Sequence, residues 1–319
     1  MNKILKKILK LFFKIIKFLT PHGIYKFFSR LNNKKNNSLN LSKYNDDLNK
    51  EKKLNFIENF NISPKDNDTC VVLGNGPSLK TTLESSKKLN FIKNYPIFCV
   101  NSFPNTDYFF LLKPEYLVYM DPFLWAKNLS EQFKPEILEI KKNITKANWK
   151  INLFMPKYAE EWNFFKDISN KNINLIYINT NISGEEDFDK RIIQFKKNEA
   201  MPQVQNVLVA CLYLGLNIGF KKIYLFGADH SWHENLMIDN ENILNIRDVH
   251  FYDKKQVNYT KAYSEADLSK TFSISSFFLA LSKKFSSYME LEEYSKVLGT
   301  KIFNASEKSY IDAFEKIKI

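Results

Sequence analysis

Short apolar runs alternate with longer helical patterns along most of this chain, from Asp68 to the C-terminus. The runs are rich in β-branched and aromatic residues and are bounded by polar or glycine-containing segments, which is typical of buried strands. They predict strands at 69–73, 97–101, 116–120, 151–155, 174–179, 222–227 and 300–303. Helical patterns, such as 204–216, lie between several of them. This alternation predicts a single Rossmann-like α/β domain over residues 68–319, with a mostly parallel sheet of about seven strands.

The pattern differs at the N-terminus, where Asn2 to Leu19 reads as one amphipathic helix. Its lysines fall within an arc of roughly 100° when residues are placed at helical spacing. In a membrane-spanning helix each lysine would cost about 2.5–3.5 kcal/mol near the bilayer centre. A helix that lies in the interface keeps every ammonium in water and buries the apolar face. We therefore expect residues 1–31 to be a basic amphipathic membrane-associating segment; a helix packed on the protein's own body is the alternative.

Charge is distributed unevenly along the chain. The formal net charge is +12, and residues 1–43 contain 11 Lys or Arg and no Asp or Glu. The remainder is almost neutral, which argues against a globular nucleic-acid-binding domain, whose basic patch would lie on the fold. Residues 32–67, rich in Asn, Lys and Ser, predict a flexible linker. The three cysteines lie in apolar runs, which favours buried thiols in a reducing compartment.

One stretch, Thr69 to Lys80, predicts a strand, a glycine turn and a helix start. Gly74-Asn75-Gly76 favours a turn with positive φ, and Pro77-Ser78 favours the first turn of a helix. Such a turn is expected to present backbone N–H groups to an anion. The dinucleotide fingerprint is absent, because Leu79 stands at the third glycine position, and the Walker A pattern is absent too. An ordinary strand–helix connection is the alternative.

Small or polar residues follow nearly every predicted strand. Because ligands of open α/β sheets bind beyond the carboxyl ends of the strands, these residues predict a polar ligand cleft. Ordinary loop chemistry remains the alternative. The strand ends are Gly74-Asn75-Gly76, Asn101-Ser102, Asp121-Pro122, Asn179-Thr180, Gly227-Ala228-Asp229, and Asn304 with Ser306.

Histidines cluster after the strand at 222–227. The spacing of His230 and His233 matches no known zinc motif, so we expect a hydrogen-bonding loop over the ligand and no metal. His250 lies in a predicted loop beside Asp248, Tyr252 and Asp253. A free imidazole has a pKa near 6.5, which suits a general base. A structural surface histidine is the other interpretation of His250.

These motifs together resemble the bacterial sialyltransferases of glycosyltransferase family 42 and the related DUF115 group. The latter includes motility-accessory glycosyltransferases and hydroxymethylpterin diphosphokinases. The resemblance covers about residues 68–310 and implies a variant of the glycosyltransferase A fold. It rests on Gly74 to Leu79, Val100-Asn101-Ser102, Tyr119 to Pro122, Gly219 to Asp229, and Lys301 to Asn304 with Ser306 and Ser309.

The resemblance also implies roles for individual residues. Asn75, Gly76, Ser78 and Asn101 would hold the CMP part of a donor, and His250 would be the catalytic base. Asp121 stands where the sialyltransferases have an Asn near the donor sugar. Their leaving phosphate meets Tyr hydroxyls, for which Tyr252 and His230 are the substitutes here. The full set expected at the donor is Gly74, Asn75, Gly76, Pro77, Ser78, Asn101, Ser102, Asp121, Gly227, Asp229, His230 and Tyr252.

The function implied is an inverting, metal-independent glycosyltransferase without a cofactor. It would move sialic acid or another nonulosonate from a CMP-sugar to a surface-glycan or lipid-linked acceptor. Its expected place is the cytoplasmic face of the bacterial inner membrane, peripherally attached through residues 1–30 to anionic lipid. Two alternatives stay open: a DUF115-type diphosphokinase that uses ATP and Mg²⁺, and a non-catalytic, membrane-tethered nucleotide-binding protein. Homo-oligomerisation also stays open.

Overall fold

A computed structural model describes residues 62, 68–125, 133–162, 165, 168–265 and 268–319. The chain divides into two units at Leu54, and all described residues belong to the second unit. The predicted amphipathic segment 1–31 lies outside the described residues, as does the predicted linker 32–67 apart from Ile62.

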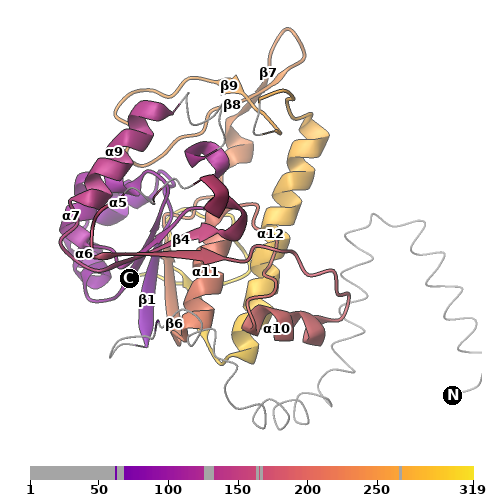
Figure 1. Cartoon of the computed structure of the whole chain (residues 1–319). Helices are drawn as coiled ribbons and strands as arrows, with labels where there is room; N and C mark the ends of the chain where they lie inside the picture. The colour runs from indigo at the N-terminus through magenta and orange to yellow at the C-terminus, as the bar shows by residue number, and fades with distance from the viewer. Residues whose placement is uncertain (1–61, 63–67, 126–132, 163–164, 166–167, 266–267) are drawn as a thin grey trace, which may run out of the picture. The chain divides into compact units, whose positions relative to one another are not determined.

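Eight parallel strands form one sheet in the order β11-β10-β6-β1-β2-β3-β4-β5, which confirms the predicted fold class (Figure 1). The strand order reverses between β1 and β6, so their carboxyl ends form the switch point of the sheet. The strands are β1 (Thr69–Leu73), β2 (Ile97–Val100), β3 (Tyr116–Val118), β4 (Ile151–Pro156), β5 (Ile173–Ile178), β6 (Lys222–Phe226), β10 (Lys301–Asn304) and β11 (Glu315–Lys316).

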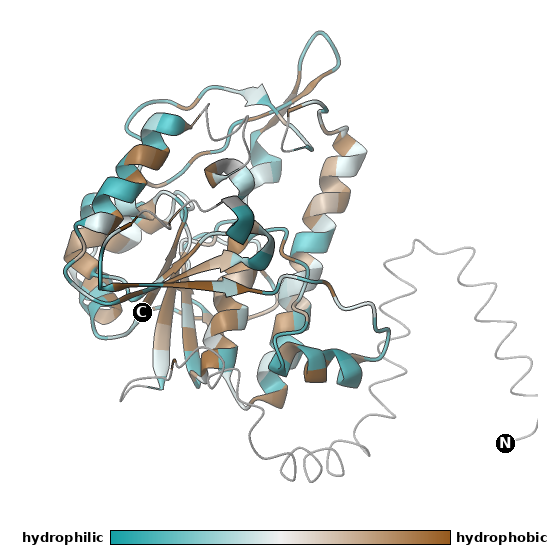
Figure 2. Ribbon diagram, in the orientation of Figure 1, coloured by the Kyte–Doolittle hydropathy of each residue, from teal (hydrophilic) through white to brown (hydrophobic). Residues whose placement is uncertain are grey.

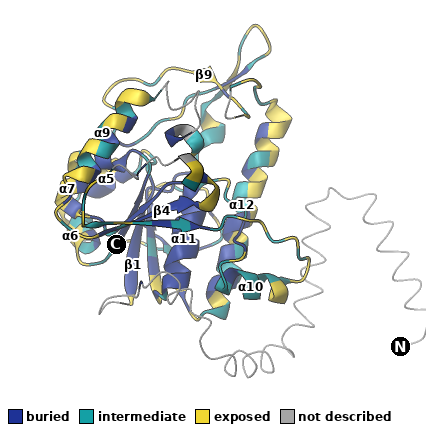
Figure 3. Ribbon diagram, viewed as in Figure 1, coloured by how far each residue is buried: buried dark blue, intermediate teal, exposed yellow. Residues whose placement is uncertain are grey.

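Helices cover both faces of this sheet, because alternate residues of the strands enter two separate apolar cores. Val71 and Leu73 face one core, whereas Cys70 and Val72 face the other. The first core includes residues of α5 (Leu79–Glu84), α6 (Ser86–Lys93), α7 (Asp107–Leu112) and α9 (Lys134–Thr145). The second includes residues of α10 (Phe188–Lys196), α11 (Val207–Ile218) and α12 (Ile274–Val297). The buried strands lie between the two helical layers in Figure 3.

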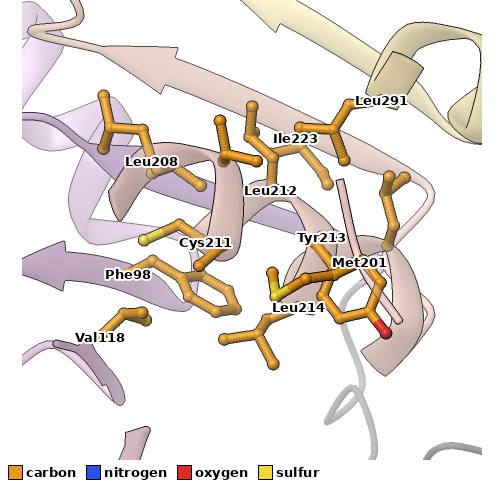
Figure 4. Packing of buried hydrophobic residues seen from close by; sticks show 14 of the residues in the cluster. Phe98, Val118, Met201, Leu208, Cys211, Leu212, Tyr213, Leu214, Ile223 and Leu291 are labelled. Atoms are coloured by element: carbon orange, nitrogen blue, oxygen red, sulfur yellow. The ribbon is translucent and has the colours of Figure 1, made fainter. Parts of the chain in front are cut away.

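Helix α11 is the central helix of its layer. All of its residues are buried, and apart from Asn217 its sequence is predominantly apolar; Figure 2 shows the helix beside β6 mostly in the colour of hydrophobic residues. Asn206 caps its first turn by accepting a hydrogen bond from the backbone N–H of Leu208. In Figure 4 the side chains of Leu208, Cys211 and Leu212 pack among those of Phe98 and Ile223 from the sheet. This packing fixes the N-terminus of α11 near the carboxyl edge of the sheet.

A second, three-stranded antiparallel sheet follows β6. Its strands are β7 (Leu236–Ile238), β8 (Leu244–Ile246) and β9 (Thr260–Lys261). Leu244 and Ala262 pack against Phe277 and Leu281 of α12, so the small sheet rests on the N-terminal half of that helix. The described part of the chain also contains short 3₁₀-helices, η1 (Phe103–Asn105), η2 (Pro122–Leu124), η3 (Lys157–Trp162) and η4 (Trp232–Asn235).

The three cysteines are free and buried, as the sequence predicted. Burial raises the pKa of each thiol well above its usual value, so all three are in the unreactive protonated form. Within the described part of the chain, no helix combines the length and the hydrophobicity that a membrane span requires.

Candidate functional site

The loops that follow β1 and β6 pack directly on each other. Gly74 donates its backbone N–H to the carbonyl of Phe226 at 2.8 Å, and Gly76 donates to the carbonyl of Gly227 at 2.9 Å. A Cβ on Gly74 would lie 2.5 Å from the carbonyl oxygen of Gly227, and one on Gly76 would lie 2.4 Å from Oδ1 of Asp229. Glycine is therefore required at both positions because two backbones approach closely.

This geometry corrects the predicted role of the glycine turn. Neither Gly74 nor Gly76 has positive φ; of these loop glycines Gly227 does, at +63°. The N–H groups of Gly74 and Gly76 are used between the loops, so the turn does not offer them to an anion. The turn thus joins two strands at the switch point and shapes the floor of the site.

Ser78 and Asp229 hold these loops together. The carboxylate of Asp229 accepts the backbone N–H of Ser78 at 3.0 Å and its hydroxyl at 2.5 Å. Burial raises the pKa of Asp229, and the hydrogen bonds from Ser78 oppose that shift. Ser78 is therefore satisfied by Asp229 and is not among the residues that line the cavity next to it.

A cavity of about 820 Å³ opens beyond the carboxyl ends of β1, β2 and β6. Most of the residues expected at the donor line it: Asn75, Gly76, Pro77, Asn101, Ser102, Asp121, Gly227, Asp229, His230 and Tyr252, together with His250. Gly74 and Ser78 lie behind this surface. Because the carboxyl ends of parallel strands share one edge of the sheet, residues far apart in sequence meet in this cavity.

Two asparagines that line this cavity each have a buried side-chain oxygen without a hydrogen-bond partner. The Asn75 side chain donates to the carbonyl of Val100 at 3.2 Å, while its Oδ1 is buried without a hydrogen-bond partner. Asn101 adopts a left-handed conformation with φ 48°, and its Oδ1 is likewise buried and unpaired. A buried polar atom without a partner costs free energy. A ligand that donates an N–H or O–H to these oxygens would remove that cost.

His250 lies on a segment attached to the glycine turn. The backbone N–H of the next residue, Phe251, donates to the carbonyl of Asn75 at 3.1 Å. The imidazole stacks on Tyr252 with the ring centroids 5.1 Å apart. Its Nε2 is 4.0 Å from Oδ2 of Asp248, and its Nδ1 is 3.9 Å from Oδ2 of Asp253. Two carboxylates therefore flank the ring.

Tyr252 and Ser102 join a network with α9. Ser102 donates its hydroxyl to Glu136, and Tyr252 is hydrogen-bonded to Ser102. Burial raises the pKa of Tyr252, so its hydroxyl stays protonated at neutral pH. Because Ser102 gives its proton to Glu136, the phenol donates its own proton to Ser102, and it would have to leave Ser102 to donate to a phosphate, the role that the resemblance assigned to it.

His230 is a buried, neutral histidine. Burial lowers its pKa to about 3. Its Nε2 is 2.7 Å from the hydroxyl of Tyr288, which in turn donates to Oδ1 of Asn206, the cap of α11. The Tyr288 hydroxyl donates its only proton to Asn206. The hydrogen bond between His230 and Tyr288 is therefore donated by Nε2–H of His230. His230 thus ties the β6 loop to α11 and α12 and borders the cavity as an uncharged group.

The other strand-end residues do not enter this cavity. Ser306 accepts the backbone N–H of Ala228 at 3.0 Å, and Asn304 donates to Ser309, so both support the β6 loop. Asn179 and Thr180 line a second cavity of about 610 Å³ beside Tyr158. The prediction of one cleft lined by six strand ends is therefore wrong at these positions.

His233 also lies outside the main cavity, where its ring packs edge-on against Tyr310. The neighbouring Glu234 is held by Lys308 and Tyr310. Among the residues that the structure describes, no three His, Cys, Asp or Glu side chains are arranged to hold a metal ion.

Several cavity residues were not found by sequence reasoning. They come from the β6 loop, α9, the start of α11, the small sheet and α12: Trp232, Glu136, Gln205, Asn206, Arg247 and Lys284. The sequence did indicate a role for Asn206, since Asn directly before an apolar helix is a common N-cap residue. Trp232 lies in the loop after the predicted strand 222–227, whereas Glu136, Gln205, Arg247 and Lys284 follow no predicted strand and reach the cavity only in the folded chain.

The all-parallel sheet and the polar cavity at its switch point define a Rossmann-like α/β protein. The chain belongs to the 6-hydroxymethylpterin diphosphokinase MptE-like family, whose model matches residues 36–235, more than half of the sequence. This finding confirms the resemblance to the DUF115 group.

A solved structure of the Maf glycosyltransferase from Magnetospirillum magneticum AMB-1 is similar with a TM-score of 0.45 and 12% sequence identity. The match covers 80% of this chain and 35% of that one, so this chain spans about a third of the length of the protein it matches. No curated protein matches the sequence.

Proposed function

We propose that this protein is a nucleotide-sugar-dependent glycosyltransferase. The donor would be a CMP-linked nonulosonate such as sialic acid, and the acceptor a hydroxyl of a surface glycan or lipid-linked glycan. The observation that carries the proposal is that two asparagines with unpaired side-chain oxygens line the same cavity as a histidine. The oxygens of Asn75 and Asn101 suit the amino group of cytosine or the hydroxyls of ribose.

The chemistry proposed for His250 is general-base catalysis. The imidazole takes the proton of the acceptor hydroxyl as that oxygen attacks the anomeric carbon of the donor sugar. The bond between this carbon and the phosphate oxygen breaks, and CMP leaves with the bonding electrons, so the configuration inverts. Asp248 and Asp253 would stabilise the imidazolium that forms, since each has a carboxylate oxygen about 4 Å from the ring.

The test has a binding arm and a rate arm. Thermal unfolding with CMP, CDP, UDP, GDP or ATP, with and without Mg²⁺, should show selective stabilisation by CMP, about 2.7 kcal/mol at one hundred times Kd. With the CMP-sugar that binds, His250→Ala should lower turnover by about 10²–10⁴-fold while donor Kd changes little. His233→Ala, which lies outside the cavity, is the matched control and should leave both unchanged. Near-normal turnover of His250→Ala would remove this residue from the mechanism.

A diphosphokinase is the second candidate, because the name of the matching family contains that activity. It would use ATP and Mg²⁺, and the acceptor oxygen would attack the β-phosphorus instead of a sugar carbon. Selective stabilisation by ATP with Mg²⁺, together with AMP release, would support it against the glycosyltransferase. A protein that binds nucleotide but catalyses no transfer would lose nothing when His250 is replaced.

We also propose peripheral attachment of the protein to the cytoplasmic face of the inner membrane through residues 1–30. The support is the charge of this segment, since each lysine near an anionic leaflet contributes roughly 1 kcal/mol of attraction. A lipid-linked acceptor would then be presented to the domain at the membrane surface.

A further inference from the structure

Lys284 of α12 lines the main cavity at a place remote in sequence from every strand end. Its Nζ lies 4.4 Å from the centroid of the Trp232 ring, within the range of a cation–π interaction. Among the described residues, no carboxylate oxygen lies within 4.0 Å of this Nζ. The preceding residue, Lys283, is exposed and does not line the cavity.

Trp232 is a fixed platform for this ammonium group. Its indole N–H donates to Oδ1 of Asp248 at 3.1 Å, and its ring centroid is 4.7 Å from that of His230. The indole takes up one side of the ammonium and provides no hydrogen-bond acceptor to it. Because an ammonium has three N–H donors, Lys284 retains donors for a ligand in the cavity.

The Lys284 ammonium is the feature of this cavity that would attract an anionic ligand. Burial lowers the pKa of Lys284, whereas Asp248 and Asp121 raise it. A cation that is largely removed from water and lacks an ion pair is unfavourable, and a bound anion would relieve this cost. The other Lys or Arg of the cavity, Arg247, donates to Asn235 at 3.0 Å and lies against the Tyr259 ring.

The glycine turn leaves the phosphate of a nucleotide without its usual partner. In many strand–turn–helix sites the backbone N–H groups of the turn hold the phosphate. Here those of Gly74, Gly76 and Ser78 are hydrogen-bonded within the protein. Three N–H groups of the turn are therefore not available to a phosphate, and a cationic side chain on another side of the cavity can meet its charge.

We propose that Lys284, held over the indole of Trp232, is the phosphate anchor of this cavity and binds the phosphate of the nucleotide donor. The proposal rests on the proposed function for the identity of the nucleotide, and on the cavity itself for the anion. Lys284 donates to the phosphate oxygens in the bound state and stabilises their charge as the nucleotide leaves. Helix α12 would thus supply what the glycine turn cannot.

The experiment compares ligands with and without a phosphate, and proteins with and without the Lys284 ammonium. Calorimetric titrations of the full chain use CMP, cytidine and inorganic pyrophosphate as probes. Lys284→Met should weaken CMP binding about 10–100-fold and leave cytidine binding unchanged, as expected for loss of a hydrogen bond between charged groups. Lys283→Met is the matched control and should bind all three probes like wild type. Lys284→Arg keeps the charge and should retain part of the preference for CMP over cytidine.

The outcomes separate this proposal from the proposed function. If Lys284→Met and wild type prefer CMP over cytidine equally, the anchor is refuted and the CMP donor stands. If pyrophosphate binding requires Lys284 and CMP does not bind, the role of Lys284 as phosphate anchor is supported and the proposal of a CMP-linked donor is refuted. If wild type binds neither CMP nor pyrophosphate, both fail. A lysine that only offset the charges of Asp121 and Asp248 would lower the thermal stability of Lys284→Met without changing the ratio of CMP to cytidine affinity.

Discussion

The contact between the β1 and β6 loops predicts different costs for two similar substitutions. Gly227 has φ +63° and Gly299 has φ +64°, so alanine at either position adopts the same unfavourable left-handed backbone. A Cβ on Gly227 would lie 2.7 Å from the carbonyl oxygen of Gly74 and 2.7 Å from Cβ of Leu79. A Cβ on Gly299 would meet nothing within 4 Å. The pair therefore separates the cost of close approach from the cost of the dihedral angle.

The magnitudes follow from these two costs. A left-handed backbone costs a non-glycine residue about 1–2 kcal/mol, which should be the whole loss of unfolding free energy in Gly299→Ala. Gly227→Ala adds two contacts to atoms that cannot rotate away, and overpacking of this kind typically costs a further 1–3 kcal/mol. We expect a total of about 2–5 kcal/mol for Gly227→Ala.

Urea unfolding followed by circular dichroism measures both losses. Gly184→Ala is the baseline, because Gly184 has neither positive φ nor an atom within 4 Å of its would-be Cβ, and we expect a change within about 0.5 kcal/mol. If Gly227→Ala destabilises no more than Gly299→Ala, the two loops are not in backbone contact. The explanation of the glycines at 74 and 76 would then be wrong as well.

Two further predictions concern His230 and the N-terminal segment. The folded-state pKa of His230, about 3, lies below the value near 6.5 of an unfolded histidine, so its contribution to stability is complete above pH 6.5 and is lost as pH falls toward 3. Wild type should lose up to about 1.4 kcal/mol per pH unit below pH 6 relative to His230→Asn, measured by urea unfolding between pH 5 and 7; equal slopes would contradict the buried neutral state. Deleting residues 1–31 should move the protein from the membrane fraction to the supernatant, while its circular dichroism spectrum stays that of a folded domain. A truncated protein that still sediments with membranes would refute the interfacial helix.

The main sheet could be predicted from the sequence because its central strands β1 and β2 are buried along their whole length and read as continuous apolar runs. All seven predicted strands are present with boundaries shifted by at most one or two residues, including those that contain a polar residue, such as β5 and β10. Strand β11 was missed, since Glu315–Lys316 is two polar residues that pair with β10 only through tertiary placement. The small sheet β7–β9 was missed for the same reason, because its strands are two or three residues long.

The candidate site could be predicted in outline but not in its internal contacts. Parallel strands bring their carboxyl ends to one edge, so Asn75, Asn101 and Asp229 were expected to lie close together, and they line one cavity. The sequence could not show that Asp229 accepts both donors of Ser78, since the two are 151 positions apart. The Gly-Asn-Gly pattern likewise predicted positive φ, whereas glycine is needed at 74 and 76 because the β6 loop approaches closely.

Lys284 illustrates a further limit of sequence reasoning. Adjacent residues on a helix point about 100° apart, so one of Lys283 and Lys284 faces solvent while the other faces the cavity. Helix α12 has apolar residues around much of its surface, including the exposed Phe278 and Leu279. Its hydrophobic pattern therefore does not predict which of the two lysines faces the cavity. The packing of Phe277 and Leu281 under the small sheet decides the rotation of the helix.

The position of the proposed base depends on the same turn that would hold the nucleoside. Asn75 contributes an unpaired oxygen to the cavity, and its carbonyl accepts the backbone N–H of Phe251, next to His250. The Phe251 ring is buried in the apolar core against Phe103, with the centroids 5.8 Å apart. A residue anchored by both a backbone hydrogen bond and a buried ring has little freedom to shift. The distance from His250 to a nucleotide bound at Asn75 would thus be set by the fold of the β1 loop.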